Sequence, residues 1–287
     1  MANRWVMGAR PRTLTAAVAP VAVGTAAGAG DGPFRAGRAA LALVVALALQ
    51  VGVNYANDYQ DGVRGTDRVR VGPIRLVGAD LASATAVRRA ALVSLAVAGL
   101  AGAALAALVQ PWLIALGAAC MAAAWAYTGG PRPYGHAGLG ELFVFVFFGL
   151  VAVTGSAYVQ QGHLSSLAVV ASVPVGLLAT ALLLANNLRD RAGDEAVGKR
   201  TLAVRLGDRR TRVLYTAVIV SSFVWMAAMT TVTPWIWLSS TAVVLAVRPV
   251  RKVLTATTGP ALVPVLIETG WLQIAAAGGL SIGLWLR

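Results

Sequence analysis

Carboxylates are concentrated in two short stretches of a chain that has few acidic residues. Only 11 of the 287 residues are Asp or Glu. More than half of them are Asp58, Asp61 and Asp67 in the first stretch and Asp190, Asp194 and Glu195 in the second. Basic residues are interleaved with the acids in both stretches. Hard divalent cations take carboxylate oxygens, and basic side chains neutralise phosphate charge, so this combination favours a divalent metal ion that bridges to a diphosphate.

The spacing within the first stretch predicts one shared surface. Asn54, Asp58 and Asp61 are spaced i, i+4, i+7, so a continued helix would place them on adjoining faces. Asn57 and Asp61 are likewise four residues apart. Glycines follow, and the chain must turn there, which lets Asp67 fold back toward the same metal.

The second stretch has the same design, because Asn186 or Asn187 precedes Asp190 and Asp194, which are again i, i+4. Like charges this close destabilise a helix unless a cation or an arginine compensates them. The alternative for either stretch is a set of solvated caps and salt bridges at a membrane surface. Two matched stretches in a chain so poor in acids favour the metal. Zinc is disfavoured because neither histidine has a thiolate nearby.

Basic side chains within or beside these stretches are the candidates for binding phosphate oxygens. They are Arg10, Arg12, Arg64, Arg75, Arg189, Lys199 and Arg200. The remaining arginines are interpreted as topology signals and contacts to anionic lipid.

A Gly- and Pro-rich segment, YTGGPRPYGHAGLGE at 127–141, predicts an irregular turn near the same face. Tyr127, Arg132 and Tyr134 lie in it, and the tyrosines either stack on a cation or an aromatic substrate or anchor the chain at the interface. His136 is interpreted as a surface residue, and Glu141 as a residue that favours the positive end of a helix.

The composition indicates an integral membrane protein. Hydrophobic residues make up 58% of the chain and charged residues only 12%, with a mean hydropathy of +0.73. The net charge of +13 does not indicate nucleic acid, because the arginines lie between apolar runs of membrane-spanning length. The single cysteine, Cys120, excludes an intrachain disulfide and is interpreted as a packing residue.

The apolar runs predict an all-α polytopic fold in a single transmembrane domain, 1–287, with nine helices around a central cavity. The cavity is expected to open to the cytoplasmic side and laterally to lipid. The predicted helices span 13–30, 38–57, 87–109, 111–128, 139–160, 165–187, 212–231, 234–248 and 270–286. Segment 257–269, broken by Pro260 and Pro264, is interpreted as re-entrant or interfacial.

Charge asymmetry predicts the orientation. Of the 24 Lys and Arg residues, all but Arg35, Arg38 and Arg287 fall in the amino terminus or in the connections after the second, fourth, sixth and eighth predicted helices. The positive-inside rule then places the amino terminus and both acidic stretches in the cytoplasm and the carboxyl terminus outside. The expected location is a bacterial plasma membrane, which the chain crosses several times. A faint echo between ANDYQD and ANNLRD indicates that the two helix ends face one cavity.

The sequence resembles the UbiA superfamily of membrane prenyltransferases, which carry NDxxDxxxD after the second helix and DxxxD after the sixth. Within it, GVRGTDRVRVGPIRLV and GKRTLAVRLG resemble the 1,4-dihydroxy-2-naphthoate polyprenyltransferase (MenA) branch. Further similarity runs through ARPRTL, YTGGPRPYGHAGLGELFVFVFFGLVAVTG and GPALVPVLIETG, so that it covers most of the chain in order.

Matched position by position, Asn57, Asp58 and Asp61 begin the first motif. Its last aspartate falls on Gly65, and Asp67 is the nearest substitute, a displacement similar to that of the MenA branch.

Asp190 and Asp194 match the second motif without a gap. In the loop that is YxxxKR in other members, Arg132 matches the arginine and Pro131 replaces the lysine.

The resemblance implies a Mg²⁺-dependent transfer of a polyprenyl chain from polyprenyl diphosphate to 1,4-dihydroxy-2-naphthoate, with loss of carbon dioxide. Its implied metal ligands are Asp58, Asp61, Asp67, Asp190 and Asp194, and Lys199 joins them as a catalytic residue. Its implied substrate-binding residues are Arg12, Asn54, Asn57, Arg64, Arg75, Tyr127, Arg132, Asn186, Asn187, Arg189 and Arg200.

Other functions stay open from the sequence. One is another UbiA-type activity, with 4-hydroxybenzoate, a haem or a phosphoribosyl compound as the acceptor. A CDP-alcohol phosphotransferase is disfavoured because the residues after Asp61 and Gly62 lack its spacing. A membrane transporter could also use intramembrane acids and broken helices. We expect contacts with membrane lipid and no nucleic-acid partner. The sequence does not indicate any protein partner.

Overall fold

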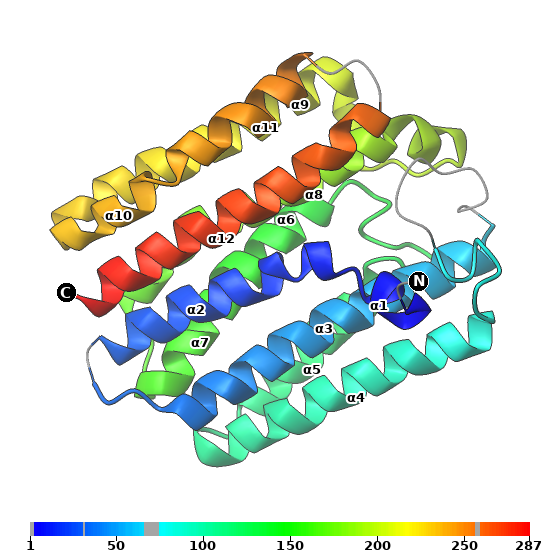
Figure 1. Ribbon diagram of the computed structural model, residues 1–287. Helices are drawn as coiled ribbons and strands as arrows, with labels where there is room; N and C mark the ends of the chain where they lie inside the picture. The colour runs from blue at the N-terminus through cyan, green and yellow to red at the C-terminus, as the bar shows by residue number, and fades with distance from the viewer. Residues whose placement is uncertain (1–2, 31, 66–74, 256–258) are drawn as a thin grey trace.

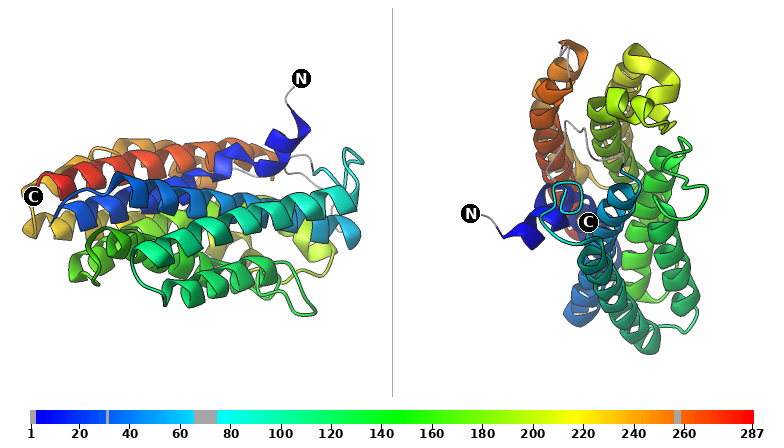
Figure 2. Two further views of the ribbon diagram at one scale, coloured as in Figure 1. Left: turned by 90° about the horizontal axis from the view of Figure 1, so that it is seen from below. Right: turned by 90° about the vertical axis from the view of Figure 1, so that its right-hand side faces the viewer.

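The computed structural model describes residues 3–30, 32–65, 75–255 and 259–287, and every regular element among them is a helix. The long helices run along a common axis in one bundle (Figures 1 and 2). A helix satisfies its backbone hydrogen bonds internally, which is what the interior of a bilayer demands. The predicted all-α class is confirmed for these residues.

The elements follow the order of the predicted apolar runs. They are α1 (Arg4–Ala9), η1 (Pro11–Thr13), α2 (Thr15–Ala29), α3 (Ala36–Val63), α4 (Ala84–Leu108), α5 (Leu113–Ala126), α6 (Gly140–Val144), η2 (Phe145–Val151), α7 (Ala152–Gln161), α8 (Ser166–Ala196), α9 (Leu202–Ala228), η3 (Met229–Thr231), η4 (Pro234–Ile236), α10 (Trp237–Ser240), α11 (Val243–Thr255), η5 (Pro260–Leu262) and α12 (Val263–Trp285).

Six described helical segments are long and apolar enough to cross a membrane. They are Ala36–Val63, Ala84–Leu108, Gly140–Gln161, Ser166–Ala196, Leu202–Thr231 and Pro260–Trp285. Thr15–Ala29 and Leu113–Ala126 are apolar but shorter. The chain is therefore a multi-pass membrane protein.

The two helices that carry the acids are longer than predicted. The sequence suggested ends near 57 and 187, but α3 continues to Val63 and α8 to Ala196. Asp58, Asp61 and Asp190 are buried within these extensions. Their polar side chains find partners inside the protein, so the change from apolar to polar sequence does not end either helix.

The proline-containing segment before α12 is helical and continuous with α12 in its described part, 259–269, so the re-entrant alternative is wrong and the interfacial one stays a prediction. Pro260 opens η5 and Pro264 lies in the first turn of α12, which runs on without interruption to Trp285. Proline is tolerated in a first helical turn because the amide that it lacks has no partner there. Residues 257 and 258 lie outside the described ranges.

A pair of glycines on α2 permits its close approach to α7. A Cβ atom added at Gly24 would lie 2.2 Å from the carbonyl oxygen of Val153, and one at Gly28 would lie 2.6 Å from that of Ala157. The four-residue spacing of Gly24 and Gly28 is the GxxxG pattern of tightly packed membrane helices. The glycines therefore let the backbones of α2 and α7 pack directly against each other.

Gly24→Ala is expected to destabilise the protein by about 1–3 kcal/mol, because the added methyl group forces two backbones apart. Thermal unfolding in detergent would show this as a lower midpoint. Gly278→Ala is the matched control: this helical glycine in α12 has open space around it, so the substitution should be neutral or slightly stabilising. Equal midpoints for the two variants would contradict the packing argument.

The polar parts of the chain gather at one end of the bundle. The carboxyl ends of α3 and α8 lie at the same end as α1, and the carboxyl terminus of the chain lies at the other end (Figure 1). This arrangement agrees with the relative orientation expected from the charge asymmetry and brings the two acidic stretches together.

Candidate active site

The two acidic stretches meet at Asp61. Its carboxylate is almost fully buried, and Lys199 Nζ lies 2.9 Å from Oδ2. His136 Nε2 is 3.6 Å from Oδ1, and Arg75 Nη2 is 3.9 Å from Oδ2. Three segments that are far apart in sequence thus place basic groups around one carboxylate.

Asp58 binds the backbone of the segment that follows α3. It is completely buried, and its two oxygens accept hydrogen bonds from the backbone amides of Leu76 (2.8 Å) and Val77 (3.0 Å). A carboxylate that accepts two backbone N–H bonds holds that backbone firmly. Asp58 therefore fixes the turn that carries Arg75 toward Asp61.

Asp190 forms a two-pronged ion pair with the neighbouring Arg189, with N···O distances of 2.6 and 2.7 Å. Both side chains are buried. Arg189 also donates a hydrogen bond of 2.8 Å to Asn186 Oδ1. The guanidinium plane is thereby held against the carboxylate.

Tyr127 directly follows the last residue of α5. Its neighbour Tyr134 packs edge-on against it, with ring centroids 5.4 Å apart.

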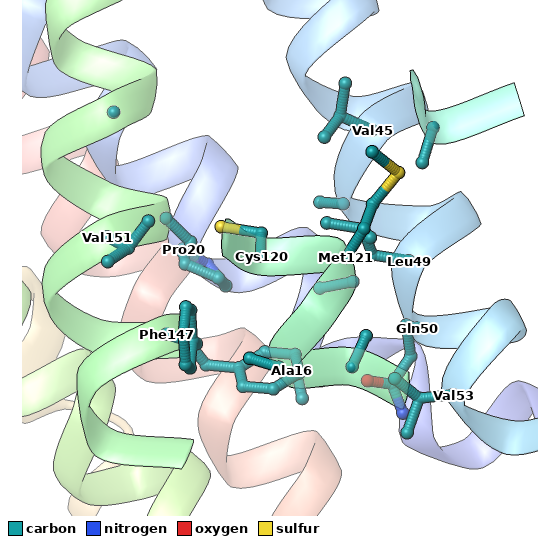
Figure 3. A pocket seen from close by; sticks show the side chains of 18 of the residues that line it. Ala16, Pro20, Val45, Leu49, Gln50, Val53, Cys120, Met121, Phe147 and Val151 are labelled. Carbon is teal, nitrogen blue, oxygen red and sulfur yellow. The ribbon is translucent and has the colours of Figure 1, made fainter. Parts of the chain in front are cut away.

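A cavity of about 410 Å³ lies next to this cluster, between α2, α3, α4, α5, η2, α7 and α8 (Figure 3). Most of its lining is apolar and small, such as Ala16, Val45 and Leu49. The polar residues that line it are Arg10, Thr13, Gln50, Asn54, Asn57, Tyr127, Tyr134, Ser156 and Asn186. It is thus an apolar chamber with polar groups concentrated on part of its wall.

The predicted asparagines have different surroundings. Asn57 lines the cavity and accepts a hydrogen bond of 2.6 Å from Thr128 Oγ1. Asn187 donates one of 2.9 Å to Glu141 Oε1 instead. Glu141 lies in the first turn of α6, as expected, but it also connects that turn to α8.

Among the predicted phosphate ligands, the exposed residues include Arg12, Arg132 and Arg200. Arg64 donates hydrogen bonds to the carbonyl oxygens of Thr128 (2.6 Å) and Gly130 (2.8 Å), which ties the end of α3 to the loop.

Asp67 lies outside the described residues, so its predicted contact with metal stays a prediction. Within the described ranges, no three His, Cys, Asp or Glu side chains converge closely enough to hold a metal ion by themselves. Asp61 and Asp190 have Lys199 and Arg189 beside them.

One interpretation from the sequence is wrong. His136 is not a surface residue, because its side chain is only 19% exposed and lies against Asp61. The turn that folds it inward is held in part by the amide of Arg200, which donates to the His136 carbonyl (3.0 Å). No local pattern signals this contact, since it joins segments distant in sequence. Cys120, interpreted as a packing residue, is partly buried and also lines the cavity.

Known proteins with this pattern identify the family. The model of the UbiA prenyltransferase family matches residues 17–258. The 1,4-dihydroxy-2-naphthoate octaprenyltransferase of Mycobacterium tuberculosis is 50% identical over 284 residues, which cover 98% of this chain and 97% of that protein. The protein of the same name from Escherichia coli is 38% identical and covers 92% of this chain and 89% of its own length.

Solved structures share the fold. The apo structure of a UbiA homolog from Aeropyrum pernix superposes with a TM-score of 0.72 at 17% identity, covering 92% of this chain and 96% of that chain. A UbiA homolog from Archaeoglobus fulgidus bound to GPP and Mg²⁺ gives a TM-score of 0.66 at 14% identity, covering 98% of this chain and all of that one. The resemblance drawn from the two aspartate motifs is confirmed, and the chain belongs to the UbiA prenyltransferase family.

Proposed function

We propose that the protein transfers a polyprenyl chain from polyprenyl diphosphate to 1,4-dihydroxy-2-naphthoate, a step of menaquinone biosynthesis that yields demethylmenaquinol, carbon dioxide and diphosphate. The observation that carries the proposal is the ion pair between Asp61 and Lys199, which joins the two aspartate stretches beside an apolar cavity. The full-length similarity to 1,4-dihydroxy-2-naphthoate octaprenyltransferases supports the choice of acceptor.

Mg²⁺ is the proposed cofactor, and the chemistry of the carboxylate donors suits it. Asp61 on α3 and Asp190 and Asp194 on α8 would supply the oxygen ligands that Mg²⁺ prefers, and phosphate oxygens and water would supply the others. We include Asp67 as a further ligand. Asp58 remains a candidate ligand through its free lone pairs, besides its role in holding the turn at Leu76.

The chain's own groups then act on the donor. When bound, Mg²⁺ stabilises negative charge on the departing diphosphate. Lys199 and Arg75 hydrogen-bond to phosphate oxygens as the C1–O bond breaks and its electron pair stays on the diphosphate. The apolar cavity keeps water from the allylic carbon. An electron-rich ring carbon of the naphthoate forms the new bond, and no protein nucleophile is required.

The orientation belongs to the same proposal. We place the end of the bundle that carries Asp61 and Lys199 at the cytoplasmic face of a bacterial plasma membrane, because most Lys and Arg residues lie at that end. The shorter apolar helices α2 and α5, together with the segment from η4 to α11, complete nine passes. The cavity then opens to the cytoplasm for the acceptor and laterally to lipid for the polyprenyl tail.

Assay of the purified protein tests the function. With polyprenyl diphosphate, 1,4-dihydroxy-2-naphthoate and Mg²⁺, we expect demethylmenaquinol and diphosphate in equal amounts, and EDTA should stop the reaction. The same assay with 4-hydroxybenzoate as the acceptor tests the alternative function. Efficient use of 4-hydroxybenzoate together with inertness toward the naphthoate would refute the proposal.

A further inference from the structure

Thr128 is a buried polar residue in the loop after α5, and only 4% of it is exposed. Its hydroxyl donates a hydrogen bond of 2.6 Å to Oδ1 of Asn57 on α3. Asn57 is also buried, so water competes little for this bond. The two residues are 71 positions apart in sequence, and their contact connects the loop to a side chain that lines the cavity.

The backbone of Thr128 is held as well as its hydroxyl. Arg64, which follows the last residue of α3, donates hydrogen bonds to the carbonyl oxygens of Thr128 (2.6 Å) and Gly130 (2.8 Å). Gly129 lies between these two carbonyl groups, and a Cβ atom added there would lie 2.4 Å from Nε2 of Gln60 on α3. The absence of a side chain at Gly129 therefore lets the loop lie directly against α3. Arg64 and this close contact fix the position from which the Thr128 hydroxyl acts.

The bond to Thr128 orients the Asn57 amide. A side-chain amide has an acceptor end and a donor end, and a half-turn of the group exchanges them. Because Oδ1 faces the Thr128 hydroxyl, Nδ2 lies on the other side of the amide. Asn57 lines the cavity, and its Nδ2 forms no hydrogen bond with the residues that the structure describes. The N–H groups of Asn57 are therefore available to a ligand.

Asn57 lies at the boundary between the acidic cluster and the apolar cavity. It precedes Asp61 by one turn of α3, which is about 6 Å along the helix axis. In the proposed reaction the diphosphate binds at Asp61 and Lys199, and the prenyl tail lies in the cavity. A donor at this boundary is close to the oxygens on which charge develops as the C1–O bond breaks. A donor that is already oriented stabilises that charge without reorganisation.

We infer that Thr128 is a positioning residue for prenyl transfer: its hydroxyl holds Asn57 Oδ1, so that Asn57 Nδ2 donates a hydrogen bond to a diphosphate oxygen. Arg64 supports this arrangement through the Thr128 backbone. A neutral donor suits the edge of an apolar cavity, because it needs no opposite charge beside it. The inference rests on the proposed function and names a residue that prepares its diphosphate site.

Binding of inorganic diphosphate in the presence of Mg²⁺, measured by titration calorimetry on the purified protein, tests this role. Thr128→Val keeps the shape of the side chain and the carbonyl that Arg64 holds, but it removes the hydroxyl. The Asn57 amide can then turn its oxygen toward the phosphate, so the Kd should rise about 10-fold, as expected for loss of one hydrogen bond. Thr128→Ser keeps the hydroxyl and should bind diphosphate within about twofold of wild type.

A double-mutant cycle separates positioning from a direct contact. Asn57→Ala removes the donor itself and should raise the Kd for diphosphate about 10-fold or more. Adding Thr128→Val to Asn57→Ala should change the Kd no further, because the hydroxyl acts only through the amide. In turnover, kcat/KM for polyprenyl diphosphate should follow the same pattern, while the KM for the naphthoate stays unchanged.

Thr211→Val is the matched control. It also removes the hydroxyl of a fully buried threonine, but this hydroxyl donates to the Gly207 carbonyl oxygen within α9, and Thr211 does not line the cavity. Diphosphate binding and the KM values for both substrates should therefore remain at wild-type level.

Three results would overturn the role of Thr128. They are a wild-type Kd for diphosphate in Thr128→Val, an equal loss of binding in Thr128→Ser, and effects of Thr128→Val and Asn57→Ala that multiply in the double variant. The first removes the effect, the second assigns it to packing, and the third separates Thr128 from Asn57. A protein that binds diphosphate in the expected pattern but does not prenylate the naphthoate would refute the proposed function and leave Thr128 as the positioning residue of a diphosphate site.

Discussion

Asp61→Ala is expected to lower kcat by about 10³-fold or more, because one carboxylate stands at the junction of both aspartate stretches. Its removal deprives the proposed Mg²⁺ of a ligand and leaves Lys199 and Arg75 without the anion that positions them. The measurement is release of diphosphate by purified protein at saturating donor, acceptor and Mg²⁺.

A variant at Asp80 provides the comparison. Asp80 lies at the same end of the bundle as Asp61, but it is exposed and in a turn. Asp80→Asn also removes one carboxylate from this end, and it should keep wild-type activity. Near-normal turnover in Asp61→Ala, with both variants present in the membrane at wild-type level, would remove Asp61 from the reaction.

Asp190→Ala should abolish activity and also lower stability. Arg189 is buried beside Asp190, and the substitution leaves its guanidinium without the two-pronged partner. Removing one member of a buried ion pair costs about 3–5 kcal/mol, since a buried charge is left uncompensated. The protein should still insert in the membrane, with a lower unfolding midpoint and no measurable diphosphate release.

A pair whose carboxylate is exposed serves as the control for this second effect. Asp208 and Arg212 also form an Arg–Asp pair, but the Asp208 side chain is 47% exposed. Asp208→Ala should change the free energy of unfolding by about 1 kcal/mol or less, because solvent screens such pairs. If both substitutions lower the midpoint equally, burial does not explain the cost at Asp190.

Periodicity and charge in the sequence predicted the helical class and the placement of both acidic stretches at one end. They did so because the length of an apolar run determines whether a segment can span the bilayer, and the Lys/Arg bias determines its orientation; both are local properties of the sequence. The extensions of α3 to Val63 and of α8 to Ala196 were missed for a related reason. Runs of Asp, Asn and Arg resemble a loop unless their burial is known.

Contacts between distant segments were beyond prediction. His136 reaches Asp61 because the loop after α5 lies against the end of α3. Arg64 holds the loop there through hydrogen bonds to two of the loop's carbonyl oxygens. The sequence predicts phosphate binding for Arg64 and gives no sign of the hydrogen bonds that it donates to this loop. An arginine in a motif looks the same in sequence whether it binds a ligand or a backbone carbonyl.

Because α3 continues through the polar region, its side chains change from apolar to amide to carboxylate along one helix. Leu49 lies at its apolar level, Gln50, Asn54 and Asn57 give amides, and Asp61 gives a carboxylate, all within one unbroken element. Each residue added to a helix turns every later side chain by about 100°. A single-residue insertion after Gln50 would therefore swing Asp61 away from Lys199 while leaving the apolar half in place. The pair between Asp61 and Lys199 therefore constrains the register of α3 through this region.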